Sequence, residues 1–254
     1  MPAPYISLNG SKIAPFKYDS NPPYGAFINT TKAGSYPVKQ VVEFTNGTSF
    51  SFVWPSSEHA FHAQKIIHLM KKNISNAQVQ QILMDTLRRI ESTKAIAGEE
   101  FLPRDDWDPI VIELTQNHPH LFGRDKRAFD ALCDSNYHSV GNPNAGLMPN
   151  GEPYTLSFMR EVVKLKLEQC PGLKQLAIDC AREAILPIEV SQYDVNWASG
   201  RDGNGANMLG IVILELGNKF YRKKSRIPFP KLLILKIIIS SCKGKTLSNY
   251  PTLL

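Results

Sequence analysis

The stretch SSEHAFHAQK, residues 56–65, combines two patterns that a helix would place on opposite sides. Glu58, His62 and Lys65 follow one another at intervals of four and three residues, which aligns them on one helical face. Apolar residues gather on the other face: Ala60, Ala63, Ile66, Ile67 and Met70. Ser56 or Ser57 is suited to cap the amino terminus. The spacing therefore predicts a helix that begins at about Glu58.

The polar row of this helix has two interpretations. Glu58, His62 and Lys65 are chemically competent groups, so the row could form the wall of an active site. The same three residues at the same spacing are also typical of a solvated face whose pairs stabilise a helix by only a few tenths of a kcal/mol. The spacing alone leaves both interpretations open.

A β-hairpin is predicted directly before this helix, and further helices after it. Asn46-Gly47 separates two β-prone runs within VKQVVEFTNGTSFSFVW, which is a strong hairpin signal. Helical periodicity predicts a second helix over residues 75–97, a third over YTLSFMREVVKLKLEQC, a fourth that starts at Pro171-Gly172, and a last one from IVILEL toward Arg222. A turn and a further helix are expected after LPRDDWDPIV, and the polar stretch after Pro187 predicts irregular structure. These elements predict a compact, single-domain, mainly α-helical fold (α+β) with a small β-hairpin.

Charge is concentrated at one end of the chain. The net charge is +6, but nine Lys or Arg and no acid fall between Lys219 and Lys245, which leaves 20 basic residues against 23 acidic ones elsewhere. A basic tail over residues 223–254 is suited to contact phosphates or an anionic surface, and equally to remain solvated. Within it, LLILKIIIS is too short to cross a bilayer and predicts a buried strand or helix.

The cysteines and the amino-terminal sequence indicate which cellular compartment and which metal sites to expect. No two of the four cysteines are spaced as C-x-x-C, so we expect reduced thiols and neither a zinc site nor a redox motif. The cysteines are Cys133, Cys170, Cys180 and Cys242. No charged region followed by an apolar run opens the chain, so no secretory signal is expected. We expect a cytoplasmic protein without a transmembrane segment, cofactor or metal; export by a dedicated bacterial system stays open.

A glycine-rich stretch stands out before the last helix. Gly200, Gly203, Gly205 and Gly210 fall within eleven positions, so their backbone N–H groups could cradle a phosphate. The stretch matches neither a Walker loop nor a Rossmann turn, and a long turn that needs positive φ explains the same composition. Trp107 and Trp197 lie beside acidic residues in polar stretches of the sequence. Each is suited either to stack on a nucleobase or to anchor a loop.

Five blocks together resemble the NADAR superfamily, also called YbiA-like proteins. They are YGAFIN at residues 24–29, SSEHAFHAQK, RDDWD, MREVVKLKLEQ and YDVNWASGRDGNGANMLGIVILEL, and they span residues 24–222. The resemblance implies a largely helical domain at 24–222, after an extension at 1–23 and before the tail at 223–254. A loop-rich insertion at about 121–153 distinguishes this chain from shorter members, and Ala60 replaces an aromatic residue.

The resemblance also implies an activity and a site. Members cleave N-glycosidic bonds: one branch hydrolyses phosphorylated ribosylaminopyrimidine intermediates of riboflavin biosynthesis, and another removes ADP-ribose from guanine in nucleic acid. The catalytic residues that it implies are Glu58, Lys65 and Asp194. Those that it implies for substrate binding are Asn29, His62, Trp107, Trp197, Gly200, Gly203, Gly205 and Asn207.

Cleavage of a ribosyl C1–N bond builds positive charge at C1 and negative charge on the leaving nitrogen. Glu58 or Asp194 is expected to stabilise C1 and position water, while Trp197 or Trp107 stacks on the base and the glycine loop holds phosphate. The resemblance gives Lys65 a Schiff-base role, beside which phosphate binding or simple pairing stays open. The alternative function is a non-catalytic module that binds ADP-ribose or NAD without turnover.

Overall fold

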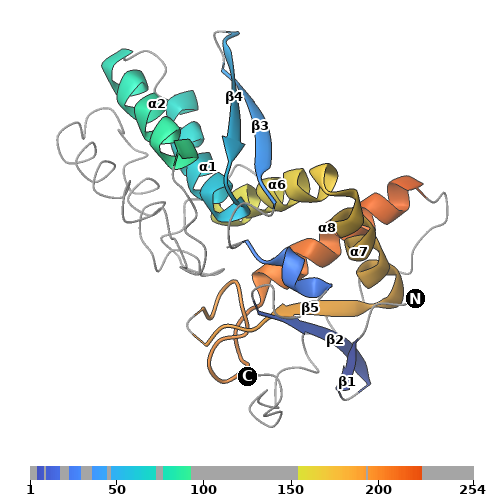
Figure 1. The fold of residues 1–254 in the computed structure, drawn as a ribbon. Coiled ribbons are helices and arrows are strands. Elements are labelled where there is room, and N and C mark those ends of the chain that lie inside the picture. The colour runs from blue at the N-terminus through green and yellow to red at the C-terminus, as the bar shows by residue number, and fades with distance from the viewer. Residues whose placement is uncertain are drawn as a thin grey trace. The chain divides into compact units, whose positions relative to one another are not determined.

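The computed structural model describes residues 5–8, 10–17, 23–29, 36–44, 47–72, 77–92, 154–192 and 194–224. The chain divides into two compact units (Figure 1). Residues 29–169 form one unit, and residues 1–28 together with 170–254 form the other. The units share a simple make-up, each with helices and a small sheet, so the mainly α-helical α+β class is confirmed.

The unit of residues 29–169 contains the predicted hairpin. Strands β3 (Val38–Glu43) and β4 (Ser49–Trp54) pair antiparallel, with Val38 opposite Trp54 and Glu43 opposite Ser49. Gly47 in the connection has φ +80°, a conformation that glycine adopts without strain. The rings of Phe52 and Trp54 stack at 4.7 Å between centroids on the buried face.

Side chains from two helices bind the outer edges of this hairpin. Gln169 accepts the N–H of Lys39 at 2.8 Å and donates to its carbonyl at 2.6 Å, so it continues the ladder beside β3. On β4, the N–H of Val53 donates to the carboxylate of Glu91 at 2.7 Å. Exposed edges invite pairing with other chains, and these bonds satisfy edge groups from within the unit.

Three helices pack with the hairpin. They are α1 (Ser57–Lys72), α2 (Ala77–Ser92) and α6 (Tyr154–Gln169), and α1 contacts both of the others. The helices predicted at about residue 58 and over YTLSFMREVVKLKLEQC are confirmed. Helix α2 confirms the predicted second helix over 77–92, while residues 75–76 and 93–97 of the prediction lie outside the described part of the chain.

The other unit is built on a three-stranded sheet of order β1-β2-β5. Strands β1 (Ile6–Leu8) and β2 (Ser11–Phe16) are antiparallel, whereas β2 and β5 (Ile185–Glu189) run parallel, with Ile13 opposite Leu186. The irregular stretch predicted after Pro187 begins later than expected, because β5 continues through that proline to Glu189. In this sheet β5 is an edge strand, a position where proline is tolerated.

Two long helices and a short 3-10 helix complete this unit. The short one is η2 (Tyr24–Phe27), and the long ones are α7 (Pro171–Glu183) and α8 (Met208–Lys224), which confirm the predicted fourth and last helices. Helix α7 begins with its proline and is capped by Ala184, whose φ of 54° turns the chain directly into β5. Helices α7 and α8 approach closely at Gly217, where a Cβ atom would lie 2.1 Å from the carbonyl oxygen of Ala177.

Several predictions lie outside the described residues: Trp107 with the helix expected after it, the insertion at about 121–153, and the basic tail beyond residue 224. The domain boundaries at 1–23, 24–222 and 223–254 stay predictions. Among the helices that the structure describes, none is long and apolar enough to cross a membrane.

Candidate functional site

The polar row of α1 is buried, contrary to what a solvated face would show. Lys65 is 4% exposed and His62 is 3% exposed, while the Glu58 side chain keeps 19% of its exposure. Burying ionisable groups is costly unless they are paired or hydrogen-bonded, so a row of such groups without a function would be expected to face solvent. The burial favours the interpretation of this row as the wall of a site.

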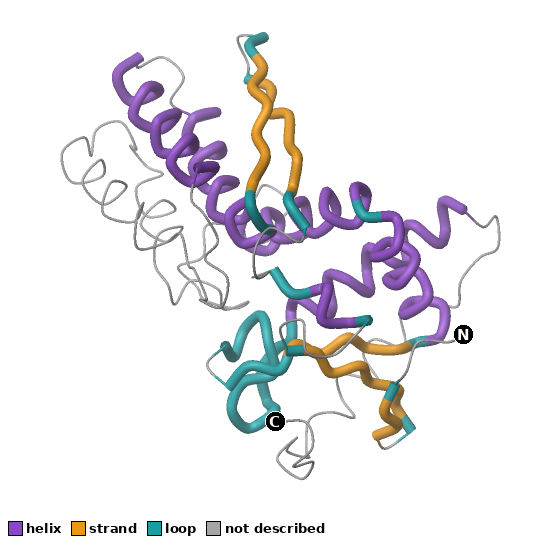
Figure 2. Tube along the Cα trace, viewed as in Figure 1, coloured by secondary structure: helices purple, strands orange, loops and turns teal. Residues whose placement is uncertain are grey.

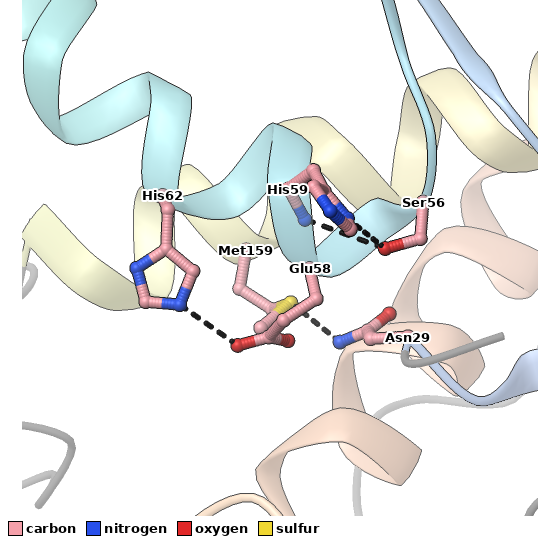
Figure 3. Close-up of polar contacts among 6 residues, drawn as sticks. All are labelled: Asn29, Ser56, Glu58, His59, His62 and Met159. Carbon is pink, nitrogen blue, oxygen red and sulfur yellow. Dashed lines mark hydrogen bonds and ion pairs between the residues drawn. The ribbon is translucent and has the colours of Figure 1, made fainter. Parts of the chain in front are cut away.

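Glu58 and His62 form the central pair of the row. His62 Nε2 lies 3.2 Å from Glu58 Oε1, and both side chains project from the same side of α1 (Figure 3). The spacing of four residues brings the two groups together across one helical turn. His62 thus pairs with the Glu58 carboxylate, while its contact with substrate stays a prediction.

Lys65 lies one turn further along the helix. Its Nζ is 4.9 Å from the centroid of the Phe61 ring, within the range of a cation–π contact. Phe61 is itself buried at 1% exposure, so the ammonium group of Lys65 contacts an apolar, buried ring. Helical spacing thus groups Lys65 with the Glu58–His62 pair on one face.

A serine–histidine pair fixes the start of α1. Ser56 Oγ lies 2.7 Å from His59 Nδ1 and also accepts the backbone N–H of His59 at 3.4 Å, so Ser56 is the cap (Figure 3). The imidazole tautomer decides whether the hydroxyl donates to Nδ1 or accepts from it. Burial lowers the pKa of His59 to about 4, with His62 adding to the shift and Glu58 opposing it. His59 is neutral at physiological pH.

Asn29 lies beside the first turn of α1. Its carbonyl oxygen accepts the N–H of Glu58 at 3.3 Å, and its amide Nδ2 donates to the sulfur of Met159 at 3.1 Å (Figure 3). These two bonds fix Asn29 between α1 and α6. Its Oδ1 is buried and has no hydrogen-bond partner among the described residues. Asn29 is therefore placed next to Glu58 with a free acceptor.

The second group of candidate residues lies in the loop between β5 and α8, a long irregular segment in Figure 2. Asp194 stands near its start: its Oδ1 accepts the N–H groups of Asn196 and Trp197 at 2.8 and 2.7 Å, an Asx turn. Its carbonyl oxygen accepts the N–H of Gly200 at 3.0 Å. Asp194 therefore organises the loop, and this structural role accounts for a carboxylate at that position.

The glycines of this loop serve its own folding. Gly200 and Gly203 have φ of +68° and +72°, and a Cβ on Gly205 would lie 2.3 Å from the carbonyl oxygen of Ala198. The N–H groups of Gly203 and Gly205 donate to carbonyls within the loop. Of the two explanations for this composition, the hydrogen bonds support the long turn that needs positive φ. Phosphate binding by the loop stays a prediction without support from these N–H groups.

Asn207 joins the end of the loop to the sheet. Its Nδ2 donates to the carbonyl of Pro187 at 2.9 Å and its Oδ1 accepts the N–H of Glu189 at 3.2 Å. A Cβ on Gly210 would lie 2.0 Å from that same Pro187 carbonyl, so α8 begins in close contact with β5. Trp197 is 7% exposed, which matches an anchor under the loop better than an open stacking platform.

The candidate residues thus fall into two groups, one on each unit. Asn29, Glu58, His62 and Lys65 are brought together around α1. Asp194, Trp197, Gly200, Gly203, Gly205 and Asn207 lie together in the loop before α8. Within the described ranges, no three His, Cys, Asp or Glu residues could hold a metal ion.

Two contributors to the α1 site were missed by sequence reasoning. His59 lies in the quoted SSEHAFHAQK block, and its spacing of three from Ser56, where a capping box places Glu or Gln, was the available signal. Met159 opens the MREVVKLKLEQ block, but nothing in the sequence indicates that its sulfur would face Asn29, 130 positions away.

Comparison with known proteins places this geometry in a family context. No family model matches the chain. The N-glycosidase YbiA of Escherichia coli K12 is 23% identical over 199 residues, which cover 78% of this chain and 83% of YbiA. The chloroplastic riboflavin biosynthesis protein PYRR of Zea mays is 20% identical over 166 residues, and the chain spans about a fifth of that protein's length, 19%.

A solved structure matches as well. The NMR structure of E. coli YbiA covers 85% of this chain and 89% of its own, with a TM-score of 0.43 and 22% identity. The sequence matches confirm the resemblance to YbiA-like proteins that the five blocks indicated. The chain is a distant homologue of YbiA, similar over most of both sequences.

Proposed function

We propose that this chain is an N-glycosidase that hydrolyses a ribosyl C1–N bond. The observation that carries the proposal is the Glu58–His62 pair, 3.2 Å apart on a polar helical face that is largely buried. The name of the relative YbiA, an N-glycosidase, supports the same class of reaction.

Glu58 answers the main electrostatic need of this reaction. Water bonds to C1 as the C1–N bond breaks, the bonding pair goes to the nitrogen, and that nitrogen takes up a proton. Positive charge develops at C1, and a nearby carboxylate stabilises it and positions the water. Glu58 suits this role because His62 orients one carboxylate oxygen. Asp194 suits it less, since its Oδ1 already accepts two backbone N–H groups.

Lys65 is the second chemical residue of the proposal. A desolvated amine can attack C1 of a ring-opened ribose, lose water and form a Schiff base, whereas a protonated amine would bind phosphate instead. Its burial at 4% exposure supports the first role, whereas the contact of Nζ with the Phe61 ring favours the protonated form. Borohydride trapping decides between them: the Schiff base gives a reduced, mass-shifted enzyme, while absence of an adduct together with an active Lys65→Arg variant removes the covalent role.

Two substrate classes follow from the family. One is a phosphorylated ribosylaminopyrimidine, which the name of the PYRR relative supports, and the other is ADP-ribosyl guanine, free or in nucleic acid. The test is a mass-spectrometric panel of NAD, ADP-ribosyl guanosine, ADP-ribosylated DNA and ribosylaminopyrimidine phosphate, offered to wild type and Glu58→Gln.

A matched control for this panel is Glu161→Gln, because Glu161 is an exposed helical glutamate on α6. We expect turnover of one substrate by wild type and by the control, with at least about a hundredfold loss in Glu58→Gln. Tight binding of ADP-ribose without turnover of any substrate would instead establish a binding module.

A further inference from the structure

The sulfur of Met159 determines which end of the Asn29 amide faces α6. Asn29 Nδ2 donates to Met159 Sδ at 3.1 Å, and the two residues are 6% and 2% exposed (Figure 3). A thioether sulfur accepts hydrogen bonds and carries no proton, so the amino end of the amide, and not its oxygen, lies against Met159. Because both residues are buried, solvent does not compete for this bond. One orientation of the Asn29 side chain is therefore selected from α6.

Asn29 in turn holds the backbone of Glu58. The first N–H groups of a helix have no partner within the helix and need acceptors from elsewhere. At the start of α1, Ser56 accepts the N–H of His59, whereas the N–H of Glu58 donates to the carbonyl oxygen of Asn29 at 3.3 Å. The backbone position of Glu58 thus depends on a residue from a distant part of the chain.

Glu58 is consequently fixed at two points, which differ in what they control. His62 Nε2 lies 3.2 Å from one carboxylate oxygen, but His62 is on the same helix, so this pair sets the direction of the carboxylate only relative to α1. The bond from the Glu58 N–H to Asn29 leads through the amide to Met159 on α6. It is this second connection that fixes the first turn of α1 relative to a neighbouring helix.

We propose that Met159 is a positioning residue for the reaction at Glu58: through Asn29 it fixes the first turn of α1, and with it the distance of the carboxylate from the reacting C1. The inference rests on the proposed function for the role of Glu58. A misplacement of about 1 Å at a reacting group can cost a hundredfold in rate. Turnover, more than substrate binding, should therefore respond to a change at Met159.

Packing between α1 and α6 has contributions that do not involve this sulfur. The ring of His68 on α1 lies 4.5 Å from that of Tyr154 and 5.5 Å from that of Phe158 on α6, centroid to centroid. Leucine and methionine have similar volumes, so Met159→Leu should keep the two helices packed. The substitution removes the acceptor of the Asn29 amide while it retains the apolar contacts.

Two substitutions at this position separate positioning from packing. In Met159→Leu, kcat should fall at least about fivefold with little change in KM. Met159→Gln restores an acceptor oxygen on a side chain of similar length, so it should recover at least about half of the wild-type kcat. It also buries an amide group, so in urea denaturation it should be the less stable of the two variants. The expected orders of activity and stability are opposite, which a role in packing alone would not produce.

Amide hydrogen exchange tests the same connection without substrate. In Met159→Leu the N–H of Glu58 should exchange at least about threefold faster than in wild type, because its acceptor on Asn29 is held less firmly. The N–H of His59 should not change, because its acceptor is Ser56.

Met70→Leu is the matched control for both measurements. Met70 is a 2% exposed methionine of α1, and its bond from Gln80 runs to its backbone carbonyl, which the substitution keeps. Its kcat and the exchange rate at Glu58 should stay as in wild type.

The outcomes separate this inference from the proposed function. Unchanged kcat and unchanged Glu58 exchange in Met159→Leu, or variant activities that follow the variant stabilities, overturn the inference. If Met159→Gln does not fold, the exchange rate at Glu58 in Met159→Leu decides. If the protein turns over nothing in the substrate panel, faster exchange at Glu58 in Met159→Leu leaves the connection from Met159 to Glu58 standing and removes the hydrolase.

Discussion

His62 Nε2 lies 3.2 Å from Glu58 Oε1 across one turn of α1, in a position where the imidazole can orient the carboxylate. The sequence predicted that both residues share a face. The structure adds that the face is buried, which strengthens the pair electrostatically and excludes it from the class of solvated surface pairs.

Replacing His62 should reduce turnover through Glu58. His62→Ala leaves the carboxylate without this partner, so we expect kcat on the substrate found in the panel to fall about tenfold or more while KM changes little. His62→Gln places an amide donor near the lost Nε2 and should recover part of kcat. Lys164→Gln, which breaks the exposed Glu161–Lys164 pair on α6, is the control and should leave both constants unchanged. Equal losses in the Ala and Gln variants would contradict a positioning role.

Stability should fall between pH 6.5 and pH 4 because of His59. Its pKa is lowered by burial from 6.5 in the unfolded chain to about 4 in the folded one, so the unfolded state binds the proton first as pH falls. Above pH 6.5 His59 does not lower the free energy of unfolding. This free energy drops by about 3 kcal/mol between pH 6.5 and pH 4, and below pH 4 the His59 contribution is constant. Urea denaturation at intervals of about half a pH unit measures this slope.

His59→Asn provides the comparison for that measurement. The asparagine keeps an acceptor near Ser56 but does not titrate, so the slope between pH 6.5 and 4 should become shallower by the His59 contribution. A variant whose stability follows pH as steeply as wild type would show that other groups control the acid limb.

Two glycines provide a paired test of the α7–α8 packing. Gly217→Ala would place Cβ 2.1 Å from the carbonyl oxygen of Ala177, so the helices must separate, at a cost of about 1–3 kcal/mol. Gly172→Ala, near the start of α7, meets no atom within 4 Å and should be neutral or slightly stabilising, because alanine favours helix. Thermal unfolding of both variants checks the difference; similar midpoints would mean that α7 and α8 do not approach closely at Gly217.

Local patterns in the sequence anticipated the helices around the site, and long-range contacts limited what more could be predicted. Helical periodicity alone predicts that Glu58, His62 and Lys65 share a face. The Asn46-Gly47 pair between two β-prone runs predicts the hairpin. The burial of that row, and the contact of Met159 with Asn29, depend on segments distant in the chain. No periodicity within a single segment encodes such contacts.

Strand β5 and the role of Asp194 show the same limit. A five-residue strand that contains Pro187 carries little local signal, and it is defined by parallel pairing with β2, about 170 positions earlier. The acidic side chain of Asp194 was equally compatible with catalysis and with a turn. Only its two bonds to the N–H groups of Asn196 and Trp197 distinguish these roles.

The two candidate carboxylates can be separated by amide substitutions. Asp194→Asn keeps an Oδ1 that accepts the same two N–H groups, so loop folding and most of kcat should survive. Asp194→Ala removes both bonds and should destabilise the protein by about 1–3 kcal/mol, because two partly buried donors lose their acceptor. Glu58→Gln keeps size and polarity but loses the charge at C1, so kcat should fall at least about a hundredfold with little change in unfolding free energy. Urea denaturation and steady-state kinetics on the three variants give both readouts. A hundredfold loss in Asp194→Asn with an intact fold would transfer the C1 role from Glu58 to Asp194.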